Sequence, residues 1–195
     1  MGPIRPRETY LRHGPLAVSW SYGPAVAGAG RDERAWVRGA QRGSASDLEA
    51  LFHAHWPAAY RAAYLVIHDA ALAEDVAQEA FLAAIRNLDR FDRRRPFGPW
   101  LHRIVVNRAI DTGKARALRR ESELTEGDAI REDAEPPDSS VLRALGGLPP
   151  EQRAVVVLRH LLGYTPGEIA RLLELPRGTV NSQLRRGLDA MRESL

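Results

Sequence analysis

The sequence of 195 residues contains no cysteine, a single lysine and no apolar run long enough to cross a membrane. Without cysteine the chain cannot form a disulfide, a thiolate zinc site or a cysteine nucleophile. A spanning helix needs about 20 consecutive apolar residues, and the first residues lack the basic-then-apolar pattern of a secretory signal. These absences lead us to expect a cytoplasmic protein.

Arginine supplies nearly all of the positive charge. Lysine and arginine together number 28 against 25 acidic residues, which gives a formal net charge of +3 and a sequence pI of about 9.7. This balance favours a polyanion as partner without proving one. The hydrophobic fraction of 44% is enough for packed cores.

Apolar residues recur at helical spacing over two parts of the chain, and no segment shows the alternation of a strand. We therefore predict an all-α protein with two small helical domains, at 31–118 and 141–195. Residues 119–140 are rich in Asp and Glu and contain Pro136-Pro137, so we expect an acidic flexible linker. Residues 1–30 are rich in Gly, Pro and Ala, and we expect a disordered extension with no assigned function.

The segment from Thr165 to Met191 has the pattern of a helix-turn-helix. Thr165, with Glu168 three residues later, predicts a capping box at the start of a short helix. After a break at 175–178, a longer helix carries an apolar face of Val180, Leu184, Leu188 and Met191. Its outer face bears amides and arginines, which can contact phosphates and base edges in a major groove. An αα-hairpin with a solvated basic face would show the same pattern.

Several segments closely resemble the extracytoplasmic-function (ECF) sigma factors, which are specificity subunits of bacterial RNA polymerase. Leu72–Leu82, Arg90–Asp92 and Pro96–Arg108 resemble region 2 of that family. Leu148–Arg153 and Gly163–Arg186 resemble region 4, so the resemblance runs in order from about 35 to 192. It implies a protein that binds core polymerase, directs it to −35 and −10 promoter elements and helps to open the DNA, without enzymatic chemistry or a cofactor.

The resemblance also implies which residues contact each partner. Asp75, Gln78 and Glu79 share one helix face, which would dock on the coiled coil of the polymerase β′ clamp, while region 4 would contact the β flap. The −10 element would be contacted by Arg93, Arg94, Arg95, Phe97, Arg103, Asn107 and Arg108. The −35 element would be contacted by Arg177, Thr179, Asn181, Ser182, Gln183, Arg185 and Arg186.

Region 4 departs from the family at Asn181 and Gln183, where basic residues are usual. Both amides can still bind base edges, but two phosphate contacts are missing, so we expect weak DNA binding by this region with a shallow salt dependence. An anti-sigma factor is a common partner in the family and is a possible one here. The alternative function is a conventional helix-turn-helix regulator that binds DNA without polymerase. An enzyme has little support, because His53 and His55 point to different sides of a helix and no glycine-rich phosphate loop is present.

Overall fold

The computed structural model describes residues 29–126 and 140–195, and over these ranges it consists of helices without a strand. This confirms the all-α prediction. The expected extension at 1–30 lies outside the described residues except for its last two, which begin α1. In chain order the elements are α1 (Ala29–Ala40), α2 (Ala45–Ile67), α3 (Ala70–Arg86), the short 3₁₀ helix η1 (Leu88–Arg90), α4 (Phe97–Glu126), α5 (Ser140–Gly146), α6 (Pro150–His160), α7 (Pro166–Leu173) and α8 (Arg177–Glu193).

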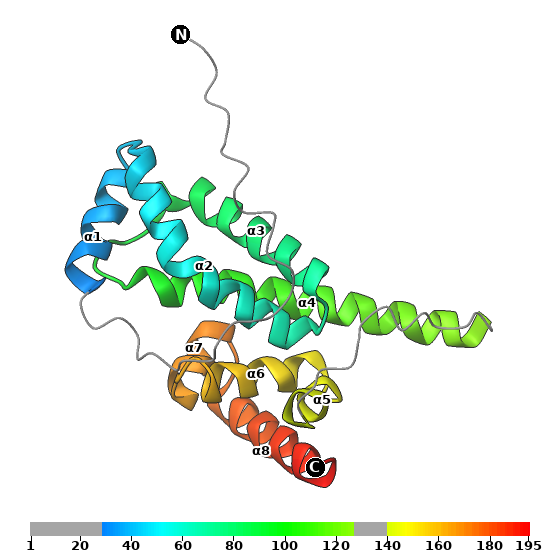
Figure 1. The fold of residues 1–195 in the computed structure, drawn as a ribbon. Coiled ribbons are helices and arrows are strands. Elements are labelled where there is room, and N and C mark those ends of the chain that lie inside the picture. Colours follow the sequence, from blue (N-terminus) through cyan, green and yellow to red (C-terminus); the bar gives the residue numbers. More distant parts are fainter. Residues whose placement is uncertain (1–28, 127–139) are drawn as a thin grey trace.

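The first bundle is formed by α1 to α4, with α2, α3 and α4 packed on one another (Figure 1). Alanines allow these helices to approach closely, because a methyl side chain takes little space between two backbones. The fully buried ones are Ala59, Ala62, Ala63, Ala73, Ala77, Ala80 and Ala109. Larger buried residues such as Leu51, Val66 and Leu101 fill the remaining core.

Side-chain caps set the start of two helices in this bundle. Ser44 caps α2 by accepting a hydrogen bond from the Asp47 amide, and Asp69 caps α3 by accepting one from the Leu72 amide at 3.0 Å. Between the two helices, His68 ends α2 in the left-handed conformation with φ of 57°.

Helix α4 is longer than the sequence analysis predicted at its C-terminal end. It continues through Glu126, so residues 119–126 are helical and the expectation that the linker begins at 119 is wrong. Residues 114–126 are rich in Ala, Leu, Arg and Glu, which are strong helix formers, and this local preference extends the helix without an apolar face. The remainder of the expected linker, 127–139, lies outside the described residues.

The second bundle is formed by α5 to α8, and α7 and α8 make the predicted helix-turn-helix. Thr165 and Glu168 form the capping box in both directions, with the Thr165 amide donating to Glu168 Oε2 at 2.8 Å. Gly187 permits close approach of α8 to α6, because a Cβ there would lie 3.1 Å from Val156 Cγ2. Glu174 ends α7 in the left-handed conformation with φ of 56° and begins the turn.

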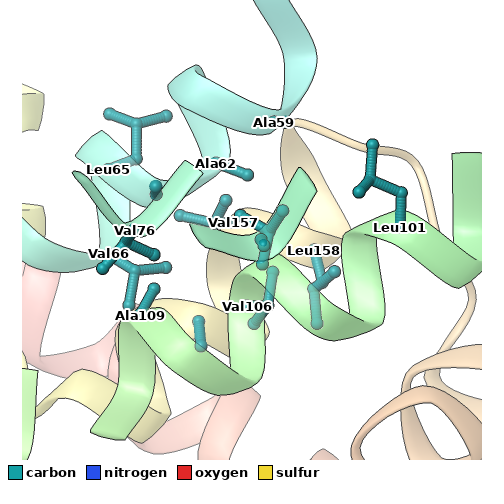
Figure 2. Close-up of a cluster of buried hydrophobic side chains, with 14 of the residues drawn as sticks. Ala59, Ala62, Leu65, Val66, Val76, Leu101, Val106, Ala109, Val157 and Leu158 are labelled. Carbon is teal, nitrogen blue, oxygen red and sulfur yellow. The ribbon is translucent and has the colours of Figure 1, made fainter. Parts of the chain in front are cut away.

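The two bundles pack against each other through α6, which contacts both α2 and α4 (Figure 1). Figure 2 shows Val157 and Leu158 of α6 among Ala62 of α2 and Leu101 and Val106 of α4. These side chains belong to one continuous buried cluster. The two helical units therefore share a hydrophobic interface in this conformation.

Candidate nucleic-acid interface and docking surfaces

The outward face of α3 is acidic and carries the residues predicted to bind polymerase. Asp75, Gln78 and Glu79 are all exposed, whereas Val76 and Ala77 between them are buried. The same face continues to Leu82 and Ile85, which are exposed by 50% and 40%. Charged groups beside exposed apolar side chains are typical of a protein-binding surface.

An apolar hollow of about 410 Å³ lies between the N-terminal end of α2 and the C-terminal end of α3. Its lining includes Leu48, Phe52, Phe81, Ile85 and Leu88. The Phe52 ring is 37% exposed and stacks on Trp56 with ring centroids 4.9 Å apart. The sequence analysis missed this hollow, because helical spacing placed Phe52 on a core face and gave no sign that the core is open there.

The loop before α4 presents three exposed arginines. Asp92 orders the loop, since its Oδ1 accepts a hydrogen bond from the Arg94 amide at 3.0 Å and its carbonyl accepts one from the Arg95 amide at 2.9 Å. The side chains of Arg93, Arg94 and Arg95 therefore project into solvent from one tight turn.

Phe97 does not lie on this surface, contrary to the prediction that it contacts the −10 element. It is 3% exposed and packs in an aromatic cluster with Phe91 and Trp100, at ring-centroid distances of 5.8 and 5.5 Å. The loop arginines are exposed because the chain turns inward at Phe97 to begin α4. Phe97 is therefore part of the aromatic core that packs beneath the arginine loop.

Arg103, Asn107 and Arg108 lie half-exposed along α4, as the periodicity predicted. Both arginines are paired with carboxylates of other elements. Arg103 forms an ion pair with Glu174, in the turn between α7 and α8, and Arg108 forms one with Glu79 on α3. The second pair joins a residue predicted to bind DNA to one predicted to bind polymerase.

Helix α8 presents the predicted −35 residues with few intramolecular contacts. Arg177, Asn181, Arg185 and Arg186 are exposed, and the Arg186 Nε donates only to the Ser182 carbonyl of its own helix at 3.3 Å. Thr179 and Ser182 are half-buried, and the Ser182 hydroxyl donates to the Thr179 carbonyl at 2.9 Å. Gln183 is also half-buried, and its Oε1 is buried without a hydrogen-bond partner among the described residues.

A buried polar cluster joins the two bundles beside the α4 surface. The Arg153 guanidinium, in a residue only 8% exposed, donates to the carbonyls of Val66 in α2 at 2.6 Å and of Gly146 and Leu148 at 2.5 and 2.7 Å. His102 of α4 and Tyr164 share a hydrogen bond of 2.8 Å between Nδ1 and the hydroxyl. These contacts connect residues far apart in sequence.

Burial keeps the histidine and tyrosine of this cluster neutral. It lowers the pKa of His102 to about 4, with a smaller contribution from His55, and it lowers the pKa of His68 at the same interface to about 4. Burial also raises the pKa of the Tyr164 hydroxyl well above its ordinary value. The interface is therefore built for uncharged imidazoles.

The described ranges hold no group of three or more His, Asp or Glu side chains arranged to bind a metal ion. Within the same ranges, no helix is both long and apolar enough to span a membrane.

Each of the two bundles contains a segment that matches a known protein family. Residues 51–122 match Sigma-70 region 2, and residues 139–191 match Sigma-70, region 4. The chain is 33% identical to the ECF RNA polymerase sigma factor SigW of Bacillus subtilis, over 70% of this chain and 82% of the relative. It is 32% identical to SigM of Mycobacterium tuberculosis, another ECF RNA polymerase sigma factor, over 85% of this chain and 87% of the relative.

Solved structures share the fold. The structure of CnrH in complex with the cytosolic domain of CnrY superposes with a TM-score of 0.62 at 28% identity, covering 83% of this chain and 95% of CnrH. The sigma factor RpoE of Bartonella quintana, solved with the anti-sigma factor NepR, has a TM-score of 0.61 at 21% identity, which supports the fold. The chain therefore belongs to the ECF sigma factors, the specificity subunits that direct RNA polymerase to promoters.

Proposed function

We propose that three exposed surfaces of this sigma factor divide the work of promoter recognition. The acidic face of α3 binds the coiled coil of the polymerase β′ clamp, the arginine loop and α4 bind the −10 element, and α8 binds the −35 element while region 4 contacts the β flap. The proposed residues are those predicted from the sequence, without Phe97. The chain acts in the cytoplasm as a binding subunit with no catalytic step of its own.

The observation that carries this proposal is the exposed α3 face. Asp75, Gln78 and Glu79 project from a helix whose opposite side is fully packed. Asp75 forms no ion pair within the described residues, Glu79 pairs with Arg108, and the neutral amide of Gln78 donates from Nε2 to Glu74 Oε1 at 3.2 Å. Exposed charges of this kind fix orientation and speed association with a partner of opposite charge.

Co-elution with purified core polymerase in size-exclusion chromatography tests the docking face. We expect the wild type to bind stoichiometrically and Asp75→Arg/Gln78→Ala to lose binding. Asp89→Arg, which reverses an exposed carboxylate on η1 rather than on α3, is the matched control and should bind as the wild type does. Failure of the wild type to co-elute, together with stable DNA binding by the free chain, would support the conventional regulator instead.

For the −10 element, the arginines and Asn107 provide the chemistry that an opened duplex requires. Guanidinium groups bind the backbone of a displaced strand, and an amide can bind an unstacked base edge. Arg108 is shared with the docking surface through its ion pair with Glu79. When polymerase engages Glu79, this pair is exchanged and Arg108 becomes available to DNA.

For the −35 element, α8 supplies three exposed arginines, Arg177, Arg185 and Arg186. We expect the full chain to bind duplex DNA weakly, with a slope of log affinity against log salt that corresponds to fewer than about six phosphates. Anisotropy of a labelled −35 duplex over a range of salt concentrations measures this slope. A steeper dependence would show that further basic residues contact the duplex.

We also propose an anti-sigma factor as a partner that covers the apolar hollow between α2 and α3. Phe52 and Ile85 line this hollow, are partly exposed and lie beside the α3 docking face. A partner segment with apolar side chains would bury them and would also block the binding of polymerase. Phe52→Ser should weaken such a complex more than it weakens polymerase binding. Equal loss of both would place the hollow in the polymerase interface instead.

A further inference from the structure

Helix α1 lies outside the matched region 2, yet it is tied to the residues on either side of the arginine loop. Two polar side chains make these contacts, one in α1 and one in the residue that follows it. The Glu33 Oε1 accepts a hydrogen bond from the Phe97 amide at 2.9 Å, and so it caps the start of α4. Gln41 Nε2 donates to the carbonyls of Leu88 and Phe91 at 2.8 and 3.1 Å.

Glu33 is held as a carboxylate by its neighbours. A hydrogen bond from His55, with the Phe97 amide and nearby positive charge, keeps the pKa of Glu33 below its ordinary value despite partial burial. His55 Nε2 lies 3.1 Å from Glu33 Oε2. The position of α1 beside the loop is thus set by Glu33 within the helix and by Gln41 in the turn that follows it.

Between these two anchors, α1 presents Arg34 and Arg38 on one face, four residues apart. They face Arg93 and Arg94 of the loop across a cleft of about 360 Å³, which these four residues line. All four side chains are exposed. None of the four guanidinium groups forms an ion pair with a carboxylate of residues 29–126 or 140–195.

This arrangement is unfavourable without an anion. Like charges at i and i+4 destabilise a helix, and the loop adds two more positive groups to the same space. Guanidinium groups are planar and bind phosphate oxygens in pairs. Four of them around one cleft therefore match the spaced charges of neighbouring phosphates in a nucleic-acid backbone.

The residues that line the cleft belong to α1 and to the loop before α4. These two elements lie at the end of the first bundle where α4 begins, away from the C-terminal end of α4 (Figure 1). The arginine loop joins it to the proposed −10 surface along α4. A strand that follows α4 past Arg103 and Arg95 would therefore enter the cleft next.

We propose that Arg34 and Arg38, together with Arg93 and Arg94, form a phosphate-binding cleft for the single DNA strand displaced when the promoter opens. The assignment rests on the proposed function, in which the loop and α4 bind the −10 element. It adds two residues of α1 to that surface. Their contacts are to the backbone, so they strengthen binding without base preference.

The test uses the full chain and a fluorescein-labelled oligothymidylate, because phosphate contacts do not depend on sequence. Arg34→Gln/Arg38→Gln is compared with Arg42→Gln/Arg119→Gln, which removes the same charge from exposed arginines outside the cleft. Anisotropy from about 50 to about 200 mM salt gives the slope of log affinity against log salt. Two lost phosphate contacts should lower its magnitude by about 1.4, and the control should lower it less.

A second comparison tests whether the four arginines act on the same phosphates. If they do, the losses from Arg34→Gln/Arg38→Gln and from Arg93→Gln/Arg94→Gln are not additive when combined. Equal slopes for the cleft variant and its control would overturn the proposal. An equal loss on duplex and single-stranded DNA, or a larger loss on oligouridylate, would overturn the assignment to the displaced DNA strand.

Co-elution with core polymerase separates this proposal from the function on which it rests. The cleft variant should co-elute as the wild type does, because the α3 face is unchanged. If the wild type fails to bind polymerase, the proposed function fails; if it binds and the slopes are equal, only the cleft fails.

Discussion

The centre and the rim of the contact between the two bundles are held by different kinds of polar interaction. At the centre, Arg153 and His102 are buried, Tyr164 is half-buried, and all three make short hydrogen bonds. At the rim, Arg103 pairs with Glu174 and Lys114 pairs with Glu151 in solvent. A buried group that loses its partner is left unsatisfied, whereas an exposed ion is simply rehydrated. We therefore expect the centre to govern stability and the rim to remain available for exchange.

The largest effect should come from Arg153→Ala. The substitution leaves three carbonyl groups without a donor and opens space in a packed interface, so we expect the free energy of unfolding to fall by about 3 kcal/mol. Urea denaturation followed by circular dichroism measures the change. Arg143→Ala, at an exposed position on α5, is the control and should change stability little. A similarly small change for Arg153→Ala would contradict the contrast between centre and rim.

The second largest effect should come from acid, which weakens the centre of the contact between the two bundles. His102 has a pKa of about 4 in the folded chain against about 6.5 when unfolded. Its stabilising effect is therefore complete above pH 6.5 and is lost as the pH falls toward 4. We expect a loss of roughly 1 kcal/mol for each pH unit below about 6.5. The difference between the wild type and His102→Gln over this range isolates the contribution, and parallel curves would exclude it.

Tyr164→Phe should have a smaller effect, because it removes one hydroxyl and keeps the ring. His102 Nδ1 then lacks its partner in a buried site, and we expect the free energy of unfolding to fall by about 1 kcal/mol. Thermal or urea denaturation gives the value. If the double variant Tyr164→Phe/His102→Gln loses as much as the two single variants added together, the hydrogen bond does not contribute.

Glu174→Gln should have the smallest effect. Its ion pair with Arg103 is exposed, and such pairs contribute about 0.2–1 kcal/mol. We expect stability to change by less than about 0.5 kcal/mol, while added salt reduces even this difference. A loss as large as that of Arg153→Ala would mean that the rim holds the bundles together.

The sequence predicted features that depend on local pattern. Helical spacing placed Asp75, Gln78 and Glu79 on one face of α3, and the capping residues Thr165 and Glu168 predicted the start of α7. These predictions succeeded because each depends on residues within one or two turns of a helix. Their roles in binding polymerase and DNA stay predictions.

The errors and omissions arose where distant parts of the chain meet. Glu33 caps α4 from 64 residues away, so no local pattern indicates that the helix begins at Phe97. Phe97 was wrongly expected on the surface for the same reason. Arginine is ordinarily an exposed residue, and the burial of Arg153 depends on carbonyl acceptors that include Val66 of the other bundle, 87 residues away.

Among the described residues, the two non-glycine residues with positive φ are His68 and Glu174, and both contact the opposite bundle. The His68 ring lies so close to Gly146 that a Cβ there would be 3.1 Å from its Nδ1. A left-handed backbone costs an ordinary L-residue about 1–2 kcal/mol, and glycine avoids that cost. Each bundle thus has one helix end whose backbone is strained and whose side chain contacts the neighbouring bundle. Glycine at either position would relieve the strain and remove that contact, so the balance between packed and separated bundles depends in part on the C-terminal residues of α2 and α7.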